Sequence, residues 1–588
     1  MAPAHPASRR AFLAGATGAL AAASGCVGEI RNLAGRQRTS QLSLTIKTPP
    51  AGEDPYAVRI ANHLATNLSE SGIATMVDPI SSDVLLRDIL VNHDFDLYVA
   101  RYPSQSAPDE LHSMLHSSYG EEAGWQNPFG FSDIEVDELL EQQRMTDGDD
   151  RIDTVHELQR QIVQLQPFTT IAFPDRIGAM RTDRFGGWPS GGLSAPTNYL
   201  ELERVGETTT LRPLLRNERI TRNRNPLAVE YRDQGDLTGL LYEPLVRTID
   251  DGADPVPWLA RRIEWDGAEP TAATVALRRT PWHDGEPVTA DDVAFTYEFL
   301  NDTSLGTFDS PVPTPWRRGQ ASLVDSVNVH SDGQFRIDFA TPNRELAYRA
   351  LSAPILPEHI WRDRAESTEV AGIDIAGQTT EALVNSNRAA IGSGPVRFDE
   401  AVTDESLSFT SFKDHFLRTD DVDGIPARFV GGGSFDRIEF TVTPSHDAAV
   451  ELLVNDEADA SADGLQASVV PRIARSEGVS LTIRQADPYY HVGFNCRRAP
   501  MTDPRFRRIT AQHIDRAFVV AESIEGYGLP SEAPLKGEWT PQDLTWSGEA
   551  TLPFLGEDGQ VDVEATRAAF REAGYQYEEG QLVRRGED

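Results

Sequence analysis

Cysteine is nearly absent from this sequence. Among 588 residues only Cys26 and Cys496 carry a thiol, and Cys26 lies within the first 26 residues, which have the character of a leader. No intrachain disulfide is therefore expected, although such a leader indicates export. Cys496 is expected to be a small, buried apolar residue; a reactive thiol, the alternative, would need a nearby base.

Lysine is also scarce, and the chain is strongly acidic. Lys47, Lys413 and Lys536 are the only lysines, and 91 acidic against 54 basic residues leave a formal net charge of −37. A surface of this charge repels phosphate backbones, so no nucleic-acid partner is expected. Acid excess with few lysines is typical of proteins that work in high salt, where ions screen the self-repulsion. We therefore attribute the charge to the solvent rather than to a ligand.

A hydrophobic run long enough to cross a membrane is missing. The apolar stretch 11–23 has 13 residues, fewer than the roughly 20 that span a bilayer. Arg9-Arg10 precedes it, and Ala23-Ser24-Gly25-Cys26 follows it. This order predicts a twin-arginine lipoprotein signal over 1–26, lipidation of Cys26, and a tether over 27–42 that leaves the protein on the outer face of the cytoplasmic membrane. An uncleaved anchor and a chance arginine pair are the alternatives.

The usual signatures of catalysis are missing as well. The chain has no Gly-x-Ser-x-Gly, no His-Glu-x-x-His, no Walker loop and no Cys-x-x-Cys. His112 and His116 are four residues apart and could share one face of a helix. No third ligand can be recognised, so an ordinary helix is expected there. No catalytic residue, metal or cofactor is predicted.

Apolar alternation and helical spacing follow one another from residue 43 onward. Strands are predicted at Ser43–Thr48, Ala74–Val77 and Phe95–Ala100, with helices at 56–71 and 83–91 between them. This β-α-β-α-β order indicates an α/β lobe. Further helices are predicted at 134–145, 150–164, 288–300, 446–454, 504–520 and 563–573, and further strands at 169–173, 199–202 and 437–442. The stretch 183–213, rich in proline, glycine and threonine, indicates a junction between units.

Eight strings carry a resemblance to a known family. In chain order they are LLYEPLVR (240–247), PWLA (257–260), WHDGEPVTADDVAFTYEFL (282–300), ILPEHIW (355–361), IGSGPVRFDEA (391–401), FDRIEFTVTPSHDAAVELLVNDEADASADGL (435–465), YYHVGFNCRRAPMTDPRFRRITAQHIDRAFVV (489–520) and VDVEATRAAFREAGY (561–575). Together they resemble the family 5 extracellular solute-binding proteins, the peptide- and nickel-binding receptors of ABC importers. One such string is weak support, but eight in the family's order are a strong signal.

The segments that close the family's chain stand at the front of this one. The strings SLTIKTPP (43–50), FDLYVARY (95–102), FSDIEVDELLEQQRMTDGDDRIDTVHELQRQIV (131–163) and TTIAFPDRIGAM (169–180) resemble the family's last segments. The order predicts a circular permutation, with the natural ends joined near 203–215. Domain termini often lie close together, and cuts at exposed loops are tolerated. A fusion of two partial copies and an error in the reading frame are the alternatives.

The resemblance implies an α/β fold of the type II periplasmic-binding-protein kind. Two lobes would close like a clamshell about a hinge of crossing strands, and a small extra subdomain would be attached. The second lobe would comprise 43–180 and 489–588, the first lobe 181–244 and 391–488, and the extra subdomain 245–390. A ligand in the cleft would favour the closed form, which docks on the permease and ATPase subunits of the importer.

Ligand contacts are expected on the strings that flank the lobe crossing. The candidates are Arg101, Tyr102, Gln105, Tyr242, Gly392, Ser393, Gly394, Tyr490, His491 and Asn495. In the family's dipeptide receptors an aspartate after the FDL string pairs with the ligand's α-amino group. Here the matching position falls near Gln105 and Asp109 comes four residues later, which puts a free-amine clamp in doubt. A tight turn at 392–394 and core packing of the aromatic residues are the alternatives.

The sequence therefore predicts a lipid-anchored solute-binding protein that captures a peptide or a related small solute for an ABC importer. A secreted hydrolase on the same scaffold, and a peptide-sensing or chaperone-like surface protein, stay open as alternatives.

Overall fold

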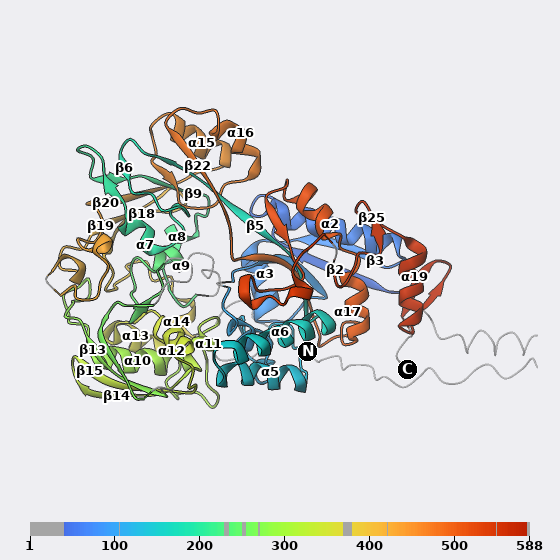
Figure 1. Ribbon diagram of the computed structural model, residues 1–588, viewed down its shortest axis with the longest axis horizontal. Coiled ribbons are helices and arrows are strands. Elements are labelled where there is room, and N and C mark those ends of the chain that lie inside the picture. Colours follow the sequence, from blue (N-terminus) through green and yellow to red (C-terminus); the bar gives the residue numbers. More distant parts are fainter. Residues whose placement is uncertain are drawn as a thin grey trace, which may run out of the picture.

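The computed structural model describes residues 40–584, except 105, 229–234, 250–254, 268–270, 369–378, 420 and 549. The predicted leader with Cys26, residues 27–39 of the predicted tether, and Gln105 lie outside the described residues. The described chain forms two lobes side by side, and segments from both ends of the sequence, blue and red, build one of them (Figure 1).

The sheet of the second lobe combines the first and the last parts of the chain. β2 (Ser43–Thr48) pairs in parallel with β3 (Ala74–Pro79) and β4 (Leu97–Tyr102). β23 (Tyr489–Phe494) then pairs antiparallel with β4 and with β5 (Phe168–Arg181), and Phe494 lies opposite Leu97. The two ends of the described chain also meet, because β1 (Ser40–Gln41) pairs with β28 (Gln581–Arg584).

Helix α2 (Pro55–Glu70) covers this sheet and shows why the local sequence folds as it does. The Asp54 carboxylate accepts a hydrogen bond from the Ala57 amide, and Pro55 occupies the first turn, where an N–H is not needed. Ile60, Ala61, Leu64 and Leu68 recur on one face and are buried. Gly72, at a φ of 97°, ends the helical segment. The prediction of a helix here is confirmed.

Strand β5 belongs to both lobes. Its first half pairs with β23 in the second lobe, and its second half pairs with β22 (Val479–Gln485) and β21 (Ala460–Ser461) in the first. The first-lobe sheet continues through β9 (Pro213–Leu215), β20 (Arg437–Val442), β19 (Ser406–Ser411) and β18 (Val396–Val402). β5 and the chain from β22 to β23 therefore cross between the lobes, as Figure 1 shows for β5.

The extra subdomain is a four-stranded antiparallel sheet with helices against it. The strand order is β12 (Ala260–Trp265), β13 (Ala272–Leu277), β15 (Gln334–Phe339) and β14 (Val324–Ser331). Helix α10 (Ala290–Asn301), predicted at 288–300, begins with a capping box of Thr289 and Asp292. The subdomain shares one hydrophobic core with the first lobe, so it is an extension of that lobe.

The remaining helices and strands complete the two lobes and the extra subdomain. The other helices are α3 (Ser82–Leu90), α4 (Glu110–Leu115), α5 (Ile134–Met145), α6 (Gly148–Leu165), α7 (Pro196–Leu200), α8 (Arg219–Arg222), α9 (Gly235–Thr238), α11 (Arg318–Ala321), α12 (Arg344–Leu351), α13 (Glu358–Trp361), α14 (Glu381–Val384), α15 (His446–Val454), α16 (Val470–Ile473), α17 (Pro504–Ala511), α18 (Arg516–Phe518) and α19 (Val563–Glu572). The other strands are β6 (Phe185–Gly186), β7 (Glu203–Arg204), β8 (Thr210–Leu211), β10 (Val246–Arg247), β11 (Val256–Pro257), β16 (Ser367–Thr368), β17 (Thr379–Thr380), β24 (Gly528–Pro530), β25 (Gly556–Glu557), β26 (Gln560–Val561) and β27 (Gln576–Glu578). Among the described helices, none has the length and apolar character needed to span a bilayer.

Two secondary-structure predictions are wrong. The first half of the predicted strand 199–202 is the end of α7, which starts at Pro196 and buries Tyr199, and residues 201–202 lie between α7 and β7. The predicted helix 504–520 is broken: α17 ends at Ala511, and a new helix starts where the Asp515 side chain accepts from the Phe518 amide. An aspartate can cap a new helix as readily as it can lie on the surface of a continuing one, and spacing alone does not distinguish these.

Candidate functional site

A cavity of about 770 Å³ lies between the two lobes, at the strand crossing. Its volume is within the range of about 300–1,000 Å³ that is typical of small-molecule sites. The second lobe lines it with residues 52–56, Arg101 and Tyr490. The first lobe lines it mainly with 215–220, 442–444 and 462–466, and β5 contributes 174–176. A ligand here would touch both lobes and the strand that joins them.

Two aromatic rings form a stiff wall on the second-lobe side. The Tyr490 hydroxyl donates to the Asp54 carboxylate at 2.9 Å, so the cap of α2 also holds this ring. Burial, reinforced by Asp54, raises the pKa of Tyr490 well above its usual value, so the phenol keeps its proton. Tyr56 meets Tyr490 edge-on, with 6.5 Å between ring centroids. Fixed aromatic rings of this kind offer flat walls at little entropic cost.

Strand β5 places a carboxylate and a guanidinium in the lining. Burial raises the pKa of Asp175, and within the described part of the chain its carboxylate has no hydrogen-bond or ion-pair partner. The Arg176 guanidinium donates to the Ala462 carbonyl at 2.6 Å, and no carboxylate among the described residues pairs with it. Among the described lining residues, Asp175 and Arg176 therefore offer charges of both signs without an ion-pair partner, as do Glu218 and Arg216, which suits a ligand that carries both charges.

Direct contacts hold the lobes together beside the cavity. Arg219 of α8 lies 3.2 Å from Glu53 and 3.2 Å from Asp83, both in the second lobe. The Ala467 amide of the first lobe donates to the Tyr56 hydroxyl at 3.2 Å. Both kinds of contact are polar: an arginine between two carboxylates, and a backbone amide on a phenol oxygen.

Of the predicted ligand contacts, Arg101 and Tyr490 line the cavity. Tyr102, His491 and Asn495 are buried behind the wall and are not among the lining residues. The His491 Nε2 is 2.9 Å from the Tyr98 hydroxyl, within an aromatic cluster that includes Tyr102.

Asn495 closes a turn instead of facing a ligand. Its side-chain amide donates to the carbonyls of His93 at 3.0 Å and of Phe95 at 2.8 Å. The structure therefore gives Asn495 a role in joining β23 to the loop before β4.

The predicted glycine turn lies against the chain at residues 240–242, outside the cavity lining. A Cβ atom on Gly394 would lie 2.0 Å from the Leu240 carbonyl oxygen, so only glycine permits this approach. Tyr242 is buried, and its hydroxyl accepts from the Asn387 amide at 2.7 Å. Ser393 is also buried. This geometry matches the tight-turn alternative.

Asp109 does not line the cavity either. It is fully buried where it meets Arg144 Nε at 2.6 Å and Arg349 Nε at 3.2 Å. Burial alone would raise its pKa, but the two arginines outweigh burial and lower the pKa to about 2. Asp109 therefore joins the second lobe to the extra subdomain.

Sequence reasoning missed Asp175, Arg176 and the pair of Glu53 and Arg219. A signal for the first two existed, because the string FPDRIG interrupts an apolar strand with two charges. Glu53 lies in the turn before α2 and Arg219 at the start of the short helix α8, and no local pattern relates residues so far apart in the chain.

The comparison with protein families matches residues 254–587 to the bacterial extracellular solute-binding proteins, family 5 Middle. The chain belongs to this family. The predicted family and the predicted two-lobed α/β fold class are both confirmed.

Several family 5 relatives are named as peptide-binding proteins. The oligopeptide-binding protein AppA of Bacillus subtilis is 24% identical over 319 residues, which cover 53% of this chain and 51% of AppA. A putative ABC transporter peptide-binding protein of Brucella ovis is 25% identical over 365 residues, which cover 60% of this chain and 58% of that protein. The peptidoglycan-binding protein YepA of Agrobacterium fabrum is 27% identical over 299 residues, which cover 47% and 43%. The chain thus spans about half the length of the curated relatives it matches.

Solved structures of family 5 type show a similar partial overlap. AppA from Bacillus subtilis in complex with a nonapeptide has a TM-score of 0.45 and 18% identity, over 64% of this chain and 66% of that one. NikZ from Campylobacter jejuni in complex with Ni(L-His) has a TM-score of 0.42 and 17% identity, over the same shares.

Proposed function

We propose that this protein is an exported receptor that binds a peptide, or a similar small zwitterion, between its lobes and delivers it to an ABC importer. One observation carries the proposal: the cavity at the strand crossing is lined by both lobes and holds Asp175 and Arg176 without partners of opposite charge. A ligand that bridges the lobes favours the closed form, because it gains contacts only there. The names of the family 5 relatives support a peptide as the ligand class.

Membrane attachment and the transporter partners complete the proposal. The twin-arginine leader and Cys26 support export and a lipid anchor on the outer membrane face. Permease and ATPase subunits would then receive the loaded, closed form. A hydrolase of the serine or cysteine type would need that nucleophile beside a base, and the described lining contains neither residue. No observation favours the hydrolase alternative.

We also propose that the chain is a circular permutant of the family. The pairing of β23 with β4 and β5, and the proximity of β1 and β28, support it. The exposed turn at 205–207 between β7 and β8 is the position where the natural ends would be joined.

The binding proposal is tested with the full mature chain. Native mass spectrometry of gently purified protein should show a co-purified small molecule, and pooled synthetic tri- to octapeptides should change the tryptophan fluorescence with saturation. Small-angle scattering should show a smaller radius of gyration on binding. A protein that neither carries a ligand nor responds to any peptide pool contradicts the proposal.

Asp175→Asn tests the role of the unpaired carboxylate. The variant should bind peptides with a free amino terminus about tenfold more weakly, the factor that corresponds to about 1.4 kcal/mol. Acetylated peptides should bind variant and parent alike. Asp183→Asn is the matched control, because Asp183 follows the same strand but pairs with Arg181 outside the lining. Equal weakening in both variants would mean that Asp175 contacts no ligand.

A further inference from the structure

A second group of ligating side chains lies on the second lobe, away from the cleft. His112 lies on α4, His116 caps the end of α4, and Glu141 lies on the neighbouring helix α5. Their ligand atoms all lie within 4.8 Å of one another. We propose that they bind one divalent transition-metal ion of the Zn²⁺ type, through His112 Nε2, His116 Nε2 and Glu141 Oε1. The i, i+4 spacing aligns the two imidazoles, and the packing of α5 on α4 supplies the third ligand.

The distances suit a tetrahedral ion. Glu141 Oε1 lies 3.1 Å from His112 Nε2 and 3.2 Å from His116 Nε2. Bonds of about 2.0–2.1 Å to Zn²⁺ place adjacent tetrahedral ligand atoms roughly 3.3 Å apart. Two edges of the tetrahedron therefore already have the required length, and an ion would take the place of the protons that now point from both Nε2 atoms to the carboxylate.

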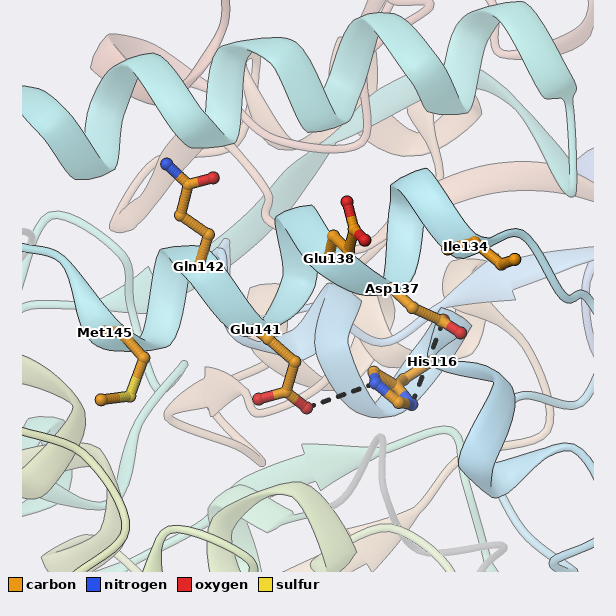
Figure 2. Close-up of a pocket in the computed structure, with 7 residues that line it drawn as sticks. All are labelled: His116, Ile134, Asp137, Glu138, Glu141, Gln142 and Met145. Atoms are coloured by element: carbon orange, nitrogen blue, oxygen red, sulfur yellow. Dashed lines mark ion pairs between the residues drawn. The ribbon is translucent and has the colours of Figure 1, made fainter.

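The surroundings orient His116 for this role. Figure 2 shows its ring between Glu141 on one side and Asp137 on the other. A metal on Nε2 puts the proton on Nδ1, where the Ser118 hydroxyl, 2.8 Å away, can accept it. The Ser118 amide now donates to Nδ1 at 3.2 Å and would lose this acceptor once Nδ1 carries the proton.

His112 is held by burial instead. Its side chain is only 3% exposed, and its Nδ1 has no hydrogen-bond partner among the described residues. A metal on Nε2 would put the proton on Nδ1, where the described residues offer no acceptor, so burial alone would orient this ring and the unpaired N–H would lower the affinity.

Access and charge favour an ion at this place. A cavity of about 470 Å³, lined by His116, Asp137, Glu138 and Glu141 among others, opens beside the ligands (Figure 2). Water can occupy the fourth position from this side, and the three acidic residues of α5 that line the cavity, Asp137, Glu138 and Glu141, attract a cation. Two imidazoles with one carboxylate suit Zn²⁺, Ni²⁺ or Cu²⁺, whereas Ca²⁺ and Mg²⁺ prefer oxygen alone.

The ion would hold α4 and α5 together, close to the ion pair of Asp109 and Arg144. Asp109 precedes α4, and Arg144 lies in the last turn of α5, so the same helix pair is joined a second time through Asp109 and Arg144. Metal binding should therefore stabilise the second lobe and leave the cleft residues in place.

The test uses the metal-free, full-length chain and Zn²⁺ alone, in high salt that screens diffuse binding to acidic groups. Calorimetry should show one saturable site, and Tm should rise with the Zn²⁺ concentration. Glu141→Gln and His116→Gln should each weaken binding by more than about tenfold to a hundredfold, the loss typical when only a residue behind a ligand is changed. X-ray absorption should show two imidazoles on the bound ion, and tetrahedral Co²⁺ should give intense visible bands.

Glu138→Gln is the matched control, because Glu138 lines the same cavity from α5 but is not a ligand. It should bind Zn²⁺ like the parent chain. Absence of a saturable site, or equal binding by Glu141→Gln and the parent, would overturn the proposal. Glu141 is 58% exposed, so its variant is expected to fold, and circular dichroism checks this. The peptide titrations are a separate readout, so the metal site can fail without the cleft failing.

Discussion

The Asp109→Asn substitution should remove the most buried ion pair between the second lobe and the extra subdomain. Asp109 accepts from Arg144 Nε at 2.6 Å, Arg144 Nη2 at 3.1 Å, Arg349 Nε at 3.2 Å and Gln143 Nε2 at 3.2 Å. Arg349 belongs to α12 of the extra subdomain, whereas Arg144 belongs to α5. Asparagine keeps the shape of the side chain but leaves both guanidinium groups without their carboxylate.

Two independent arguments give the magnitude. Removal of one partner from a buried ion pair costs about 3–5 kcal/mol, because the remaining charge stays uncompensated. The pKa of Asp109 falls from 3.8 to about 2, and at about 1.36 kcal/mol per pKa unit this corresponds to roughly 2.4 kcal/mol. We therefore expect a loss of about 2–5 kcal/mol in the free energy of unfolding near neutral pH.

The pH dependence has a definite sign. Because the folded pKa of Asp109 lies below the unfolded value, the stabilisation is fully present above about pH 4 and is lost as the pH falls toward about 2. The difference between the parent chain and the variant should shrink over the same range.

Guanidinium unfolding followed by circular dichroism measures the effect, and a double-mutant cycle with Arg349→Met isolates the interlobe part. Asp543→Asn is the control, since Asp543 and Arg160 form an exposed pair that should contribute less than about 1 kcal/mol. A loss below about 1 kcal/mol for Asp109→Asn, or a loss no larger than that of the control, would refute the reasoning.

Two further predictions follow from the buried histidines and from the chain order. Burial lowers the pKa of His491 to about 3. Burial is also the main reason that the pKa is lowered to about 4 for four other histidines, which are His93, His283, His446 and His513. The unfolded chain takes up these protons first, so stability should fall as the pH drops from about 6.5 toward 4, by up to about 1.4 kcal/mol per pH unit for each of the fully buried His491 and His513. The half-buried His93, His283 and His446 should contribute less, because solvent screens them. Unfolding at pH 7.5, 6.0 and 5.0 at constant salt checks this, and a constant midpoint would contradict it. The second prediction tests the circular permutation with a variant that restores the family's segment order. In this variant residue 584 is linked to residue 40, and the chain is opened between Gly206 and Glu207. It should unfold cooperatively and bind the same ligand as the parent. Reopening inside β5, between Ile177 and Gly178, should abolish folding; a failure of both variants would argue against the permutation.

Local sequence patterns were sufficient to predict a helix where the helix carries its own start and stop signals. Asp54 with Pro55, the Thr289–Asp292 box and Asp562 each mark a helix that the structure contains. The prediction failed at 504–520, where Asp515 starts a new helix, and at 199–202, where Pro196 does so. In both cases the residue is compatible with two local structures, and packing selects one of them.

The candidate site was less accessible to sequence reasoning. Arg101 and Tyr490 line the cavity as expected, since both follow from the strings at the lobe crossing. Tyr102, His491 and Asn495 lie on the same strings but are buried. Strand alternation sends neighbouring side chains to opposite faces, and the sequence does not state which face meets the cleft.

The sequence by itself determined the family, the α/β class, the acidic surface and the scarcity of thiols, because each depends on composition or on short ordered strings. Only the tertiary structure decided which charges remain unpaired in the cleft, that Asp109 joins the second lobe to the extra subdomain, and that Glu141 approaches His112 and His116. Those pairings link positions far apart in the chain or on different helices, and their distances depend on how the elements pack against one another. Local propensity and spacing carry no information about that packing.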